Sequence, residues 1–338
     1  FTQRKWSANF CSNADQFVVN QIYCHLWTIL MKFLVIFLLL LILNTKAYSE
    51  EKTIRMLFVG DVMLDELPGE MIKQGKNPFS AFDQIFEKAD VAIGNLECVI
   101  SEKGEPEKKP FTFRAHPRVI PLLKKYFSAL SLANNHSGDY GPLAFSDMLD
   151  LLDQNGVLYF GGGQNIRLAH EPQMIGIKGK RIAILGYNEF LPRSFEALND
   201  RSGIAWSDDD YVIYDIQRAK IEYKADVVIV YPHWGWEREK IASARQMKLA
   251  RIMIDAGADV IVGAHPHVTQ NIEWYKDKPI FYSLGNFVFN GFDEGEETTG
   301  WALELSISPD LQITWKIHIA KLDQNGIPQY AGELKDIP

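Results

Sequence analysis

Short apolar runs that each end in a polar cluster are the dominant pattern along this chain. Ile54–Gly60, Asp90–Asn95 and Asp226–Tyr231 are rich in β-branched and apolar residues, and polar side chains follow each of them directly. Runs of this length, bounded by glycine or polar residues, are typical of buried strands. The same pattern predicts further strands at Ser128–Ala133, Asp259–Val262, Pro279–Leu284, Phe287–Phe289, Trp301–Ser306 and Gln312–Ala320, whereas the three glycines at 161–163 read as a flexible turn.

Helices are predicted between many of these strands. Apolar residues at helical spacing occur in Phe79–Lys88, Pro117–Lys125, Gly141–Gln154 and Ala242–Ala256, and an Asp-rich start at residues 208–210 predicts a helix that ends at Lys224. Alternating strands and helices indicate an α/β fold. Two regions depart from this alternation: Gln173–Ile177 and Arg181–Tyr187 read as a hairpin, and the strands after residue 279 alternate in polarity, as in an antiparallel part of a sheet.

Polar residues with metal-binding or catalytic potential follow five of the predicted strands. Open α/β sheets bind their ligands at the carboxyl ends of the strands, and carboxylates are costly to bury unless they are paired or bind metal. Scattered surface residues would not recur at one strand end after another, so we expect these side chains to share a pocket. They are Asp61, Asn95 with Glu97, Asn135 with His136, His233, and His265 with His267.

His265 and His267 flank Pro266 directly after a predicted strand. Proline restricts its own backbone and favours an extended conformation in the residue before it. In an extended segment, residues two apart point the same way, so both imidazoles are expected on one face. An ordinary surface turn is the alternative, and the other strand-end clusters favour metal binding.

Imidazoles, carboxylates and a carboxamide form a mixed nitrogen and oxygen donor set. Such a set suits Mn, Fe or Zn better than metals that prefer thiolates. The number of candidate ligands is compatible with one or two divalent ions, and two ions can stabilise both the attacking and the leaving oxygen of a hydrolytic reaction.

Composition and net charge indicate an ordinary globular protein and argue against some kinds of binding partner. The chain has 338 residues, of which 47% are hydrophobic and 23% charged, as in ordinary globular proteins. Residues 50–338 contain 31 basic and 42 acidic residues, a net charge of −11. This balance argues against a nucleic-acid partner. The three cysteines, Cys11, Cys24 and Cys98, have neither a disulfide pattern nor zinc-site spacing.

The N-terminal region reads as a targeting segment. Met31-Lys32 is followed by eleven apolar residues, Phe33–Leu43, and by a small-x-small pattern that ends at Ser49. This pattern predicts a signal peptide at 31–49, and its apolar run is too short to span a bilayer. Residues 1–30 would then be an upstream extension, and residues 50–338 would form a single domain. The mature protein is then exported, to the periplasm, the cell surface or the medium. If residues 1–30 belong to the protein, Leu26–Leu43 can act as an uncleaved membrane anchor.

A charged loop, 102–110, and Arg114 allow two interpretations. Lys103, Lys108 and Lys109 can form a solvated loop, or they can form a basic rim for an anionic substrate with Arg114 as a clamp.

Six ordered motifs extend the polar clusters. They are Gly60-Asp61, Asn95-Leu96-Glu97, Ala133-Asn134-Asn135-His136, His233-Trp234-Gly235-Trp236-Glu237, Gly263-Ala264-His265-Pro266-His267 and Ser283-Leu284-Gly285-Asn286-Phe287. Together they resemble the CapA capsule-synthesis (poly-γ-glutamate biosynthesis) family, and the similarity runs from about Ile54 to Phe289. That family is similar to calcineurin-like metallophosphoesterases, which implies a four-layer α/β/β/α sandwich of two mixed sheets.

The resemblance also implies roles for individual residues. Asp61 would bind a first metal, Asn135 a second, and Glu97, alone or with Asn95, would replace the bridging acid. His136 would stabilise the transition state or protonate the leaving group. The remaining metal ligands would be His233, His265 and His267, and the remaining candidate substrate-binding residues are Asn134, Trp234, Glu237 and Asn286.

One departure from the wider superfamily concerns the first motif. Phosphoesterases carry Asp-x-His there, whereas Asp61 is followed by Val62 and Met63. A thioether is a poor ligand for a hard divalent ion, so one metal position is a ligand short.

These observations predict an exported, metal-dependent hydrolase or transferase that acts on a phosphoester or γ-glutamyl bond in capsule biosynthesis. Its substrate would be an anionic polymer or a small molecule. The alternative is a non-catalytic accessory protein that contains a metal and binds polyglutamate or membrane subunits of a capsule synthase. The missing metal ligand beside Asp61 and the net charge of −11 favour a non-catalytic role, since a broadly acidic surface repels a polyanionic substrate.

Overall fold

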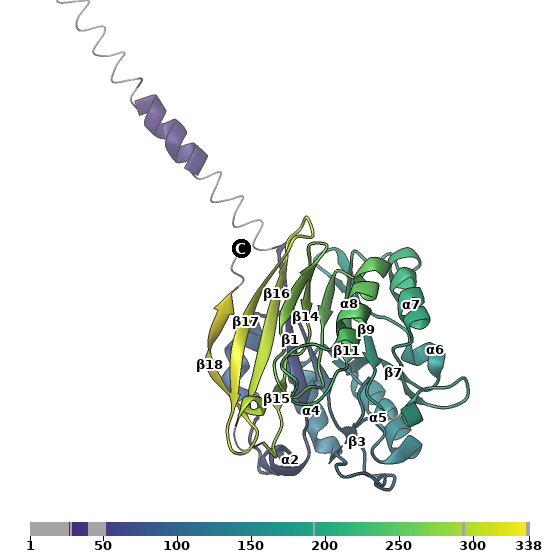
Figure 1. Ribbon diagram of the computed structural model, residues 1–338. Coiled ribbons are helices and arrows are strands. Elements are labelled where there is room, and N and C mark those ends of the chain that lie inside the picture. The colour runs from purple at the N-terminus through teal and green to yellow at the C-terminus, as the bar shows by residue number, and fades with distance from the viewer. Residues whose placement is uncertain (1–26, 28, 40–51, 192, 293–294, 336–338) are drawn as a thin grey trace, which may run out of the picture. The chain divides into compact units, whose positions relative to one another are not determined.

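The computed structural model of the protein describes residues 27, 29–39, 52–191, 193–292 and 295–335 (Figure 1). It contains two compact units, residues 1–52 and 53–338. In the first unit, residues 29–39 are helical and exposed. Most of the predicted extension 1–30 and the predicted cleavage position after Ser49 lie outside the described residues. Among the residues that are described, no helix is both long and apolar enough to cross a membrane.

Two mixed β-sheets form the centre of the second unit. In the first sheet, β1, β2, β5 and β6 are parallel, and β16, β17 and β18 are antiparallel. Its order is β18 (Pro328–Lys335), β17 (Ile313–Leu322), β16 (Thr299–Ile307), β1 (Ile54–Val62), β2 (Val91–Leu96), β5 (Ala129–Ser131) and β6 (Leu158–Phe160), with β15 (Asn286–Val288) also paired to β1.

The second sheet is parallel at its centre and antiparallel at both edges. Its order is β13 (Ile272–Tyr275), β14 (Lys278–Phe281), β12 (Val260–Val262), β11 (Val227–His233), β9 (Lys180–Asn188) and β8 (Gln173–Ile177). The β8–β9 pair is the predicted hairpin. Two small sheets pair β3 (Val99–Ile100) with β4 (Arg114–Ala115), and β7 (Gly162–Gly163) with β10 (Gly203–Ile204).

Helices connect most of the parallel strands. The α-helices are α2 (Glu66–Lys73), α3 (Asp83–Lys88), α4 (Ile120–Tyr126), α5 (Gly141–Asn155), α6 (Ile166–Ala169), α7 (Asp209–Ile221) and α8 (Ala244–Ala256). Short 3₁₀ turns occupy Ser80–Phe82, Pro117–Val119, Arg193–Phe195 and Glu296–Thr298.

Successive residues of the central strands pack on opposite faces of each sheet, and this arrangement defines the layers of the fold. On β1, Phe58 packs in a cluster shared with the second sheet, and its neighbour Leu57 packs with α3, α4 and α5. On β11, Ile229 packs toward the first sheet and Val228 packs with α7 and α8. Successive strand residues point to opposite faces, so the order is helices, sheet, sheet, helices (Figure 1). The predicted four-layer α/β/β/α sandwich is therefore confirmed.

The antiparallel prediction for the region from residue 279 is wrong for β15 and only partly right for β14. In the second sheet, β14 is antiparallel to β13 but parallel to β12, whereas β15 is parallel to β1 in the first sheet. The chain crosses between the sheets within residues 282–285, and local polarity carries no information about such a crossing. In the first sheet, β16, β17 and β18 are antiparallel to one another.

An ionic cluster joins three strands of the first sheet. Glu304 on β16 lies 3.0 Å from His318 Nε2 and 3.3 Å from Lys316 Nζ, both on β17, and His318 Nδ1 lies 3.6 Å from Glu333 on β18. The hydrogen bond with His318 lowers the pKa of Glu304 to about 2; burial opposes this shift, and Lys316 supports it. His318 therefore helps to hold the Glu304 carboxylate in its charged form.

Replacing Glu304 by Gln is expected to remove stability that depends on pH. A carboxyl group whose pKa is lowered by folding stabilises the protein above its unfolded pKa, near 4.5, and this contribution disappears as the pH falls toward 2. The Glu304 side chain is 19% exposed, so solvent screening limits the difference in unfolding free energy to about 1–2 kcal/mol at pH 7. Urea denaturation of wild type, Glu304→Gln and the exposed control Glu87→Gln between pH 7 and pH 2 measures it. Parallel pH profiles for all three would contradict the assignment.

Candidate metal centre

The carboxyl ends of the central strands bring polar side chains together between the two sheets. Asp61, near the end of β1, lies opposite Asn95 of β2 on one side and Asn286 of β15 on the other. All three side chains are fully buried. Buried polar groups of this kind require partners, so the contacts between them define the centre.

Gly60 makes the approach of β15 to β1 possible. A Cβ atom at this position would lie 1.8 Å from the carbonyl oxygen of Gly285, so any other residue would push the two segments apart. The close approach allows the Asp61 N–H to donate to the same carbonyl at 3.0 Å. Gly60 therefore places Asn286 beside Asp61.

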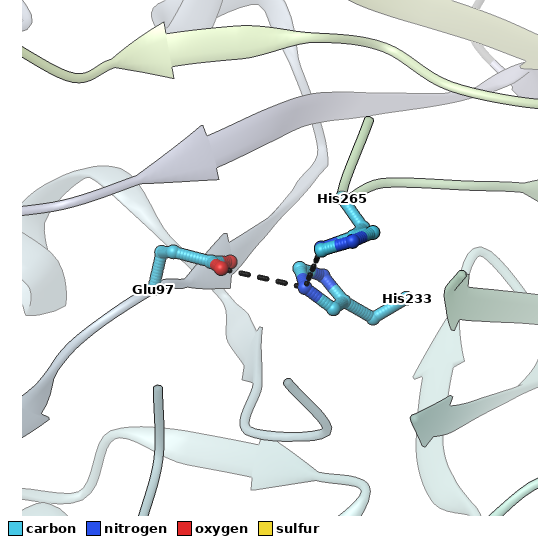
Figure 2. A group of neighbouring side chains, drawn as sticks. All are labelled: Glu97, His233 and His265. Carbon is cyan, nitrogen blue, oxygen red and sulfur yellow. Dashed lines mark hydrogen bonds and ion pairs between the residues drawn. The ribbon is translucent and has the colours of Figure 1, made fainter. Parts of the chain in front are cut away.

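Glu97, His233 and His265 form the most compact ligand group (Figure 2). One potential ligand atom from each lies within 4.8 Å of the other two. His233 Nε2 is 3.3 Å from Glu97 Oε1 and 3.0 Å from His265 Nδ1. The same nitrogen is 2.7 Å from Asn135 Oδ1, while His233 Nδ1 is 4.0 Å from Asp61 Oδ1. His233 therefore lies at the middle of the centre.

A second group surrounds Asp61. Asn95 Nδ2 donates to Asp61 Oδ1 at 2.8 Å and also to Glu97 Oε2. His267 Nδ1 lies 3.4 Å from Asp61 Oδ2 and 2.8 Å from Asn286 Oδ1. The structure thus brings all the predicted metal ligands into one pocket, namely Asp61, Asn95, Glu97, Asn135, His233, His265 and His267.

Three buried ligand atoms are incompletely satisfied within the described part of the chain. Asp61 Oδ2 and Glu97 Oε1 each face an imidazole nitrogen, at 3.4 Å and 3.3 Å, and His265 Nε2 has no hydrogen-bond partner. Leaving a buried polar atom unsatisfied costs about 1–3 kcal/mol, so three in one pocket indicate a missing partner. A divalent cation satisfies carboxylate oxygens and an imidazole nitrogen together, and this donor set fits Mn, Fe or Zn.

The conformation of the His265–His267 segment differs from the extended one that we predicted. His265 and His267 have φ values of +99° and +58°, a region that costs residues other than glycine about 1–3 kcal/mol. The segment is fixed at both ends, because Ala264 bridges to His233 and Thr269 bridges to Leu284. The few residues between these anchors must form a tight turn, and this tertiary constraint overrides the local preference before proline. The two rings nevertheless lie 5.9 Å apart.

The electrostatic environment favours metal-binding forms of two ligands. Burial and the neighbouring His233 lower the pKa of His265 well below its usual value. Burial raises the pKa of Glu97, but the charge and hydrogen bond of His233 outweigh it and lower the pKa to about 2. For His267, hydrogen bonding and charge from Asp61 outweigh burial and raise the pKa to about 9. A neutral imidazole at His265 and a carboxylate at Glu97 are the states that bind metal.

His136 forms a dyad with Asp139 beside the centre. His136 Nδ1 lies 2.7 Å from Asp139 Oδ2, and the carboxylate is fully buried. The same carboxylate accepts the backbone N–H of Phe113 at 2.7 Å and pairs with Lys109. Because a carboxylate accepts hydrogen bonds, these contacts favour the tautomer with the proton on Nδ1. Nε2 is then the ring nitrogen that can contact a substrate. Asp139 was not among the residues predicted for the site, although its position three residues after His136 is a signal that could have identified it.

Asn134 and Asn286, predicted to bind substrate, support other residues of the centre. Asn134 Nδ2 donates to Asn95 Oδ1 at 3.0 Å, and its own Oδ1 accepts the His136 N–H at 3.0 Å. Asn286 holds His267 through the contact described above. Both side chains therefore fix the geometry of neighbouring site residues.

Three other predicted substrate-binding residues have no hydrogen bond or ion pair to the ligand cluster, as far as the described residues go. The Trp234 indole donates to the Tyr282 carbonyl at 2.8 Å and is buried. Glu237 is exposed. The Arg114 guanidinium lies 4.2 Å from the centroid of the Tyr140 ring. Their assignment to substrate binding stays a prediction.

Met63, at the position of the absent histidine, is buried, and its sulfur accepts the Asp65 N–H at 3.2 Å.

Comparison with known proteins places these features in a family. The capsule biosynthesis protein CapA of Bacillus anthracis is 34% identical over 257 residues, which cover 72% of this chain and 61% of that protein. The PGA biosynthesis protein CapA of Bacillus subtilis (strain 168) is 34% identical over 253 residues, covering 73% and 66%. The chain thus spans less than two thirds of the length of these relatives.

A solved structure, that of Haemophilus influenzae NAD nucleotidase (NadN), is similar with a TM-score of 0.47 and 11% identity, covering 83% of this chain and 54% of that one. The family model described as "Bacterial capsule synthesis protein PGA_cap" matches residues 55–291, which include every predicted metal ligand. The chain therefore belongs to the bacterial capsule synthesis protein family PGA_cap.

Proposed function

We propose that this protein is an exported, metal-dependent hydrolase or transferase of capsule (poly-γ-glutamate) biosynthesis that acts on a phosphoester or γ-glutamyl bond. Membership of the capsule synthesis family supports the process, and the segment 31–49 supports export. The observation that carries the chemistry is the set of unsatisfied buried ligand atoms on Asp61, Glu97 and His265.

The residues of the chain supply binding, orientation and proton transfer. Asp61, Glu97, His233, His265 and His267, with the carboxamide oxygen of Asn135, would hold one or two divalent ions. When bound, such ions supply Lewis acidity and make water a nucleophile near neutral pH. The Asn95 amide donates to both carboxylates and so fixes their orientation.

His136 is suited to deliver a proton to the leaving oxygen or nitrogen. The Asp139 carboxylate accepts a hydrogen bond from Nδ1–H, which keeps the ring oriented with Nε2 free to exchange a proton with the substrate. Asn134 joins the His136 segment to the ligand cluster, because its Oδ1 accepts the His136 N–H and its Nδ2 donates to Asn95.

Metal analysis and turnover of the purified protein test this function together. We expect one or two Mn, Fe or Zn ions per chain, and Mn²⁺-supported cleavage of generic phosphodiesters or of poly-γ-glutamate. A chelator should abolish turnover, and Mn²⁺ should restore it. A protein that holds no divalent ion, or whose turnover is insensitive to the chelator, would exclude the proposal.

A second candidate is a non-catalytic accessory protein with a structural metal that binds polyglutamate or membrane subunits of a capsule synthase. The complete burial of Asp61, Glu97, His233 and His265 favours it, because structural metal sites are closed whereas catalytic sites keep an open position. Tightly held metal without turnover of either substrate class, and with no exchangeable water on the ion, would support this candidate.

A further inference from the structure

A cavity of about 330 Å³ borders the metal centre on the side of Asn135. Asn135 and Asp139, from the segment after β5, form one part of its lining. Asn188, at the end of β9, forms another, and it lies opposite His233 in the register of β9 and β11. The cavity therefore lies beside both the ligand at the middle of the centre and the dyad that contains the proposed acid.

Lys109 lines this cavity, but its positive charge is paired with a carboxylate of the protein. Its ammonium group pairs with the buried Asp139 carboxylate and donates to the Asn135 carbonyl at 2.9 Å. Lys109 thus holds the His136 dyad and a metal ligand in place. The charge available to a ligand must come from other residues of the lining.

Lys108 and Arg201 supply that charge. Neither forms an ion pair with a carboxylate of the described residues, and Arg201 Nη2 donates only to the Glu196 carbonyl, at 2.8 Å. After Lys109 and Asp139 neutralise each other, Glu107 is the acidic side chain left in the lining. The cavity is therefore positive, although residues 50–338 carry a net charge of −11. Two unpaired cations at the edge of a buried centre indicate an anion-binding subsite.

We propose that this cavity binds carboxylates of a glutamyl chain next to the bond that reacts at the metal centre. The proposal rests on the proposed function and extends it by naming the subsite. A guanidinium group matches a carboxylate with two parallel hydrogen bonds, and an ammonium group acts as a compact point charge. Lys108 and Arg201 come from different loops, so together they suit a chain with successive carboxylates better than one compact anion.

Binding measurements with matched double variants test this inference. Isothermal titration of the metal-loaded protein with a γ-linked glutamate pentamer compares wild type, Lys108→Gln/Arg201→Gln and the control Lys76→Gln/Lys248→Gln. The control makes the same change in net charge at exposed lysines away from the cavity. We expect the Kd of the cavity variant to rise about tenfold or more, and that of the control to change less than about twofold.

Three results would overturn the inference. They are an unchanged Kd in the cavity variant, a wild type that does not bind the pentamer, and inorganic phosphate that binds as tightly as the pentamer and depends equally on Lys108 and Arg201. The last result would assign the cavity to a phosphate group. Turnover is measured separately, so binding that depends on these residues without turnover contradicts only the proposed function. Turnover of poly-γ-glutamate that is insensitive to them contradicts only this inference.

Discussion

Replacement of His233 by Ala is expected to lower both metal affinity and kcat/KM by at least about 100-fold, because even residues that only support metal ligands contribute 10–100-fold. His233 is the shared neighbour of the centre, with Nε2 2.7 Å from Asn135 Oδ1, 3.0 Å from His265 Nδ1 and 3.3 Å from Glu97 Oε1. Its loss removes the imidazole that lies 3.3 Å from Glu97 and takes a ligand from the most compact group. Equilibrium dialysis with elemental analysis measures metal affinity, and steady-state kinetics measures turnover.

His318→Ala is the matched control for this experiment. His318 is also a buried histidine that contacts a carboxylate, but it lies between β16 and β18 and not in the centre. It should lose stability and keep its metal and its turnover. Near-ultraviolet circular dichroism establishes that both variants are folded. If folded His233→Ala retained the metal content and turnover of wild type, the centre would not be the site of metal binding.

Replacement of Asp139 by Asn is expected to lower kcat by about 10²–10⁴-fold without loss of metal, as for other residues that orient a catalytic histidine. The introduced carboxamide would retain the shape of the side chain but lose the charge that holds the His136 proton on Nδ1. Its NH₂ group could instead donate to Nδ1, which would place the proton on the wrong nitrogen. Rapid-quench or steady-state kinetics, with metal content measured on the same samples, checks this result.

Asp153→Asn provides the control, because Asp153 is an exposed aspartate that contacts Tyr159 at the end of α5. It should leave kcat unchanged. A kcat for Asp139→Asn within about threefold of wild type would remove His136 from the reaction. Loss of metal in the same variant would instead show that Asp139 acts by supporting the ligands.

The location of the centre could be predicted from the sequence because strand ends are visible locally. An apolar run that stops at a polar residue marks the end of a buried strand, and parallel strands present these ends at one edge. The meeting of Asp61, Asn95 and His233 could therefore be expected from the sequence alone. The four-layer sandwich was implied by the family resemblance, and the alternating core residues of β1 and β11 confirm it.

The features that were missed depend on contacts between distant segments. The crossing of the chain from β14 to β15 places Asn286 beside Asp61, and no local pattern reveals it. The left-handed backbone of His265 and His267 follows from bridges at both ends of their turn. Lys109 could be interpreted only as part of a charged loop, because its partner Asp139 is thirty residues away and is visible only in the fold.

The ligands of the centre are divided between the two sheets of the sandwich. Asp61, Asn95 and Glu97 belong to the strand ends of the first sheet, whereas His233, His265 and His267 belong to those of the second. A metal ion bound among them would cross-link the two sheets. Its removal would weaken the packing of one sheet on the other and abolish activity, so the free energy of unfolding would depend on the concentration of metal.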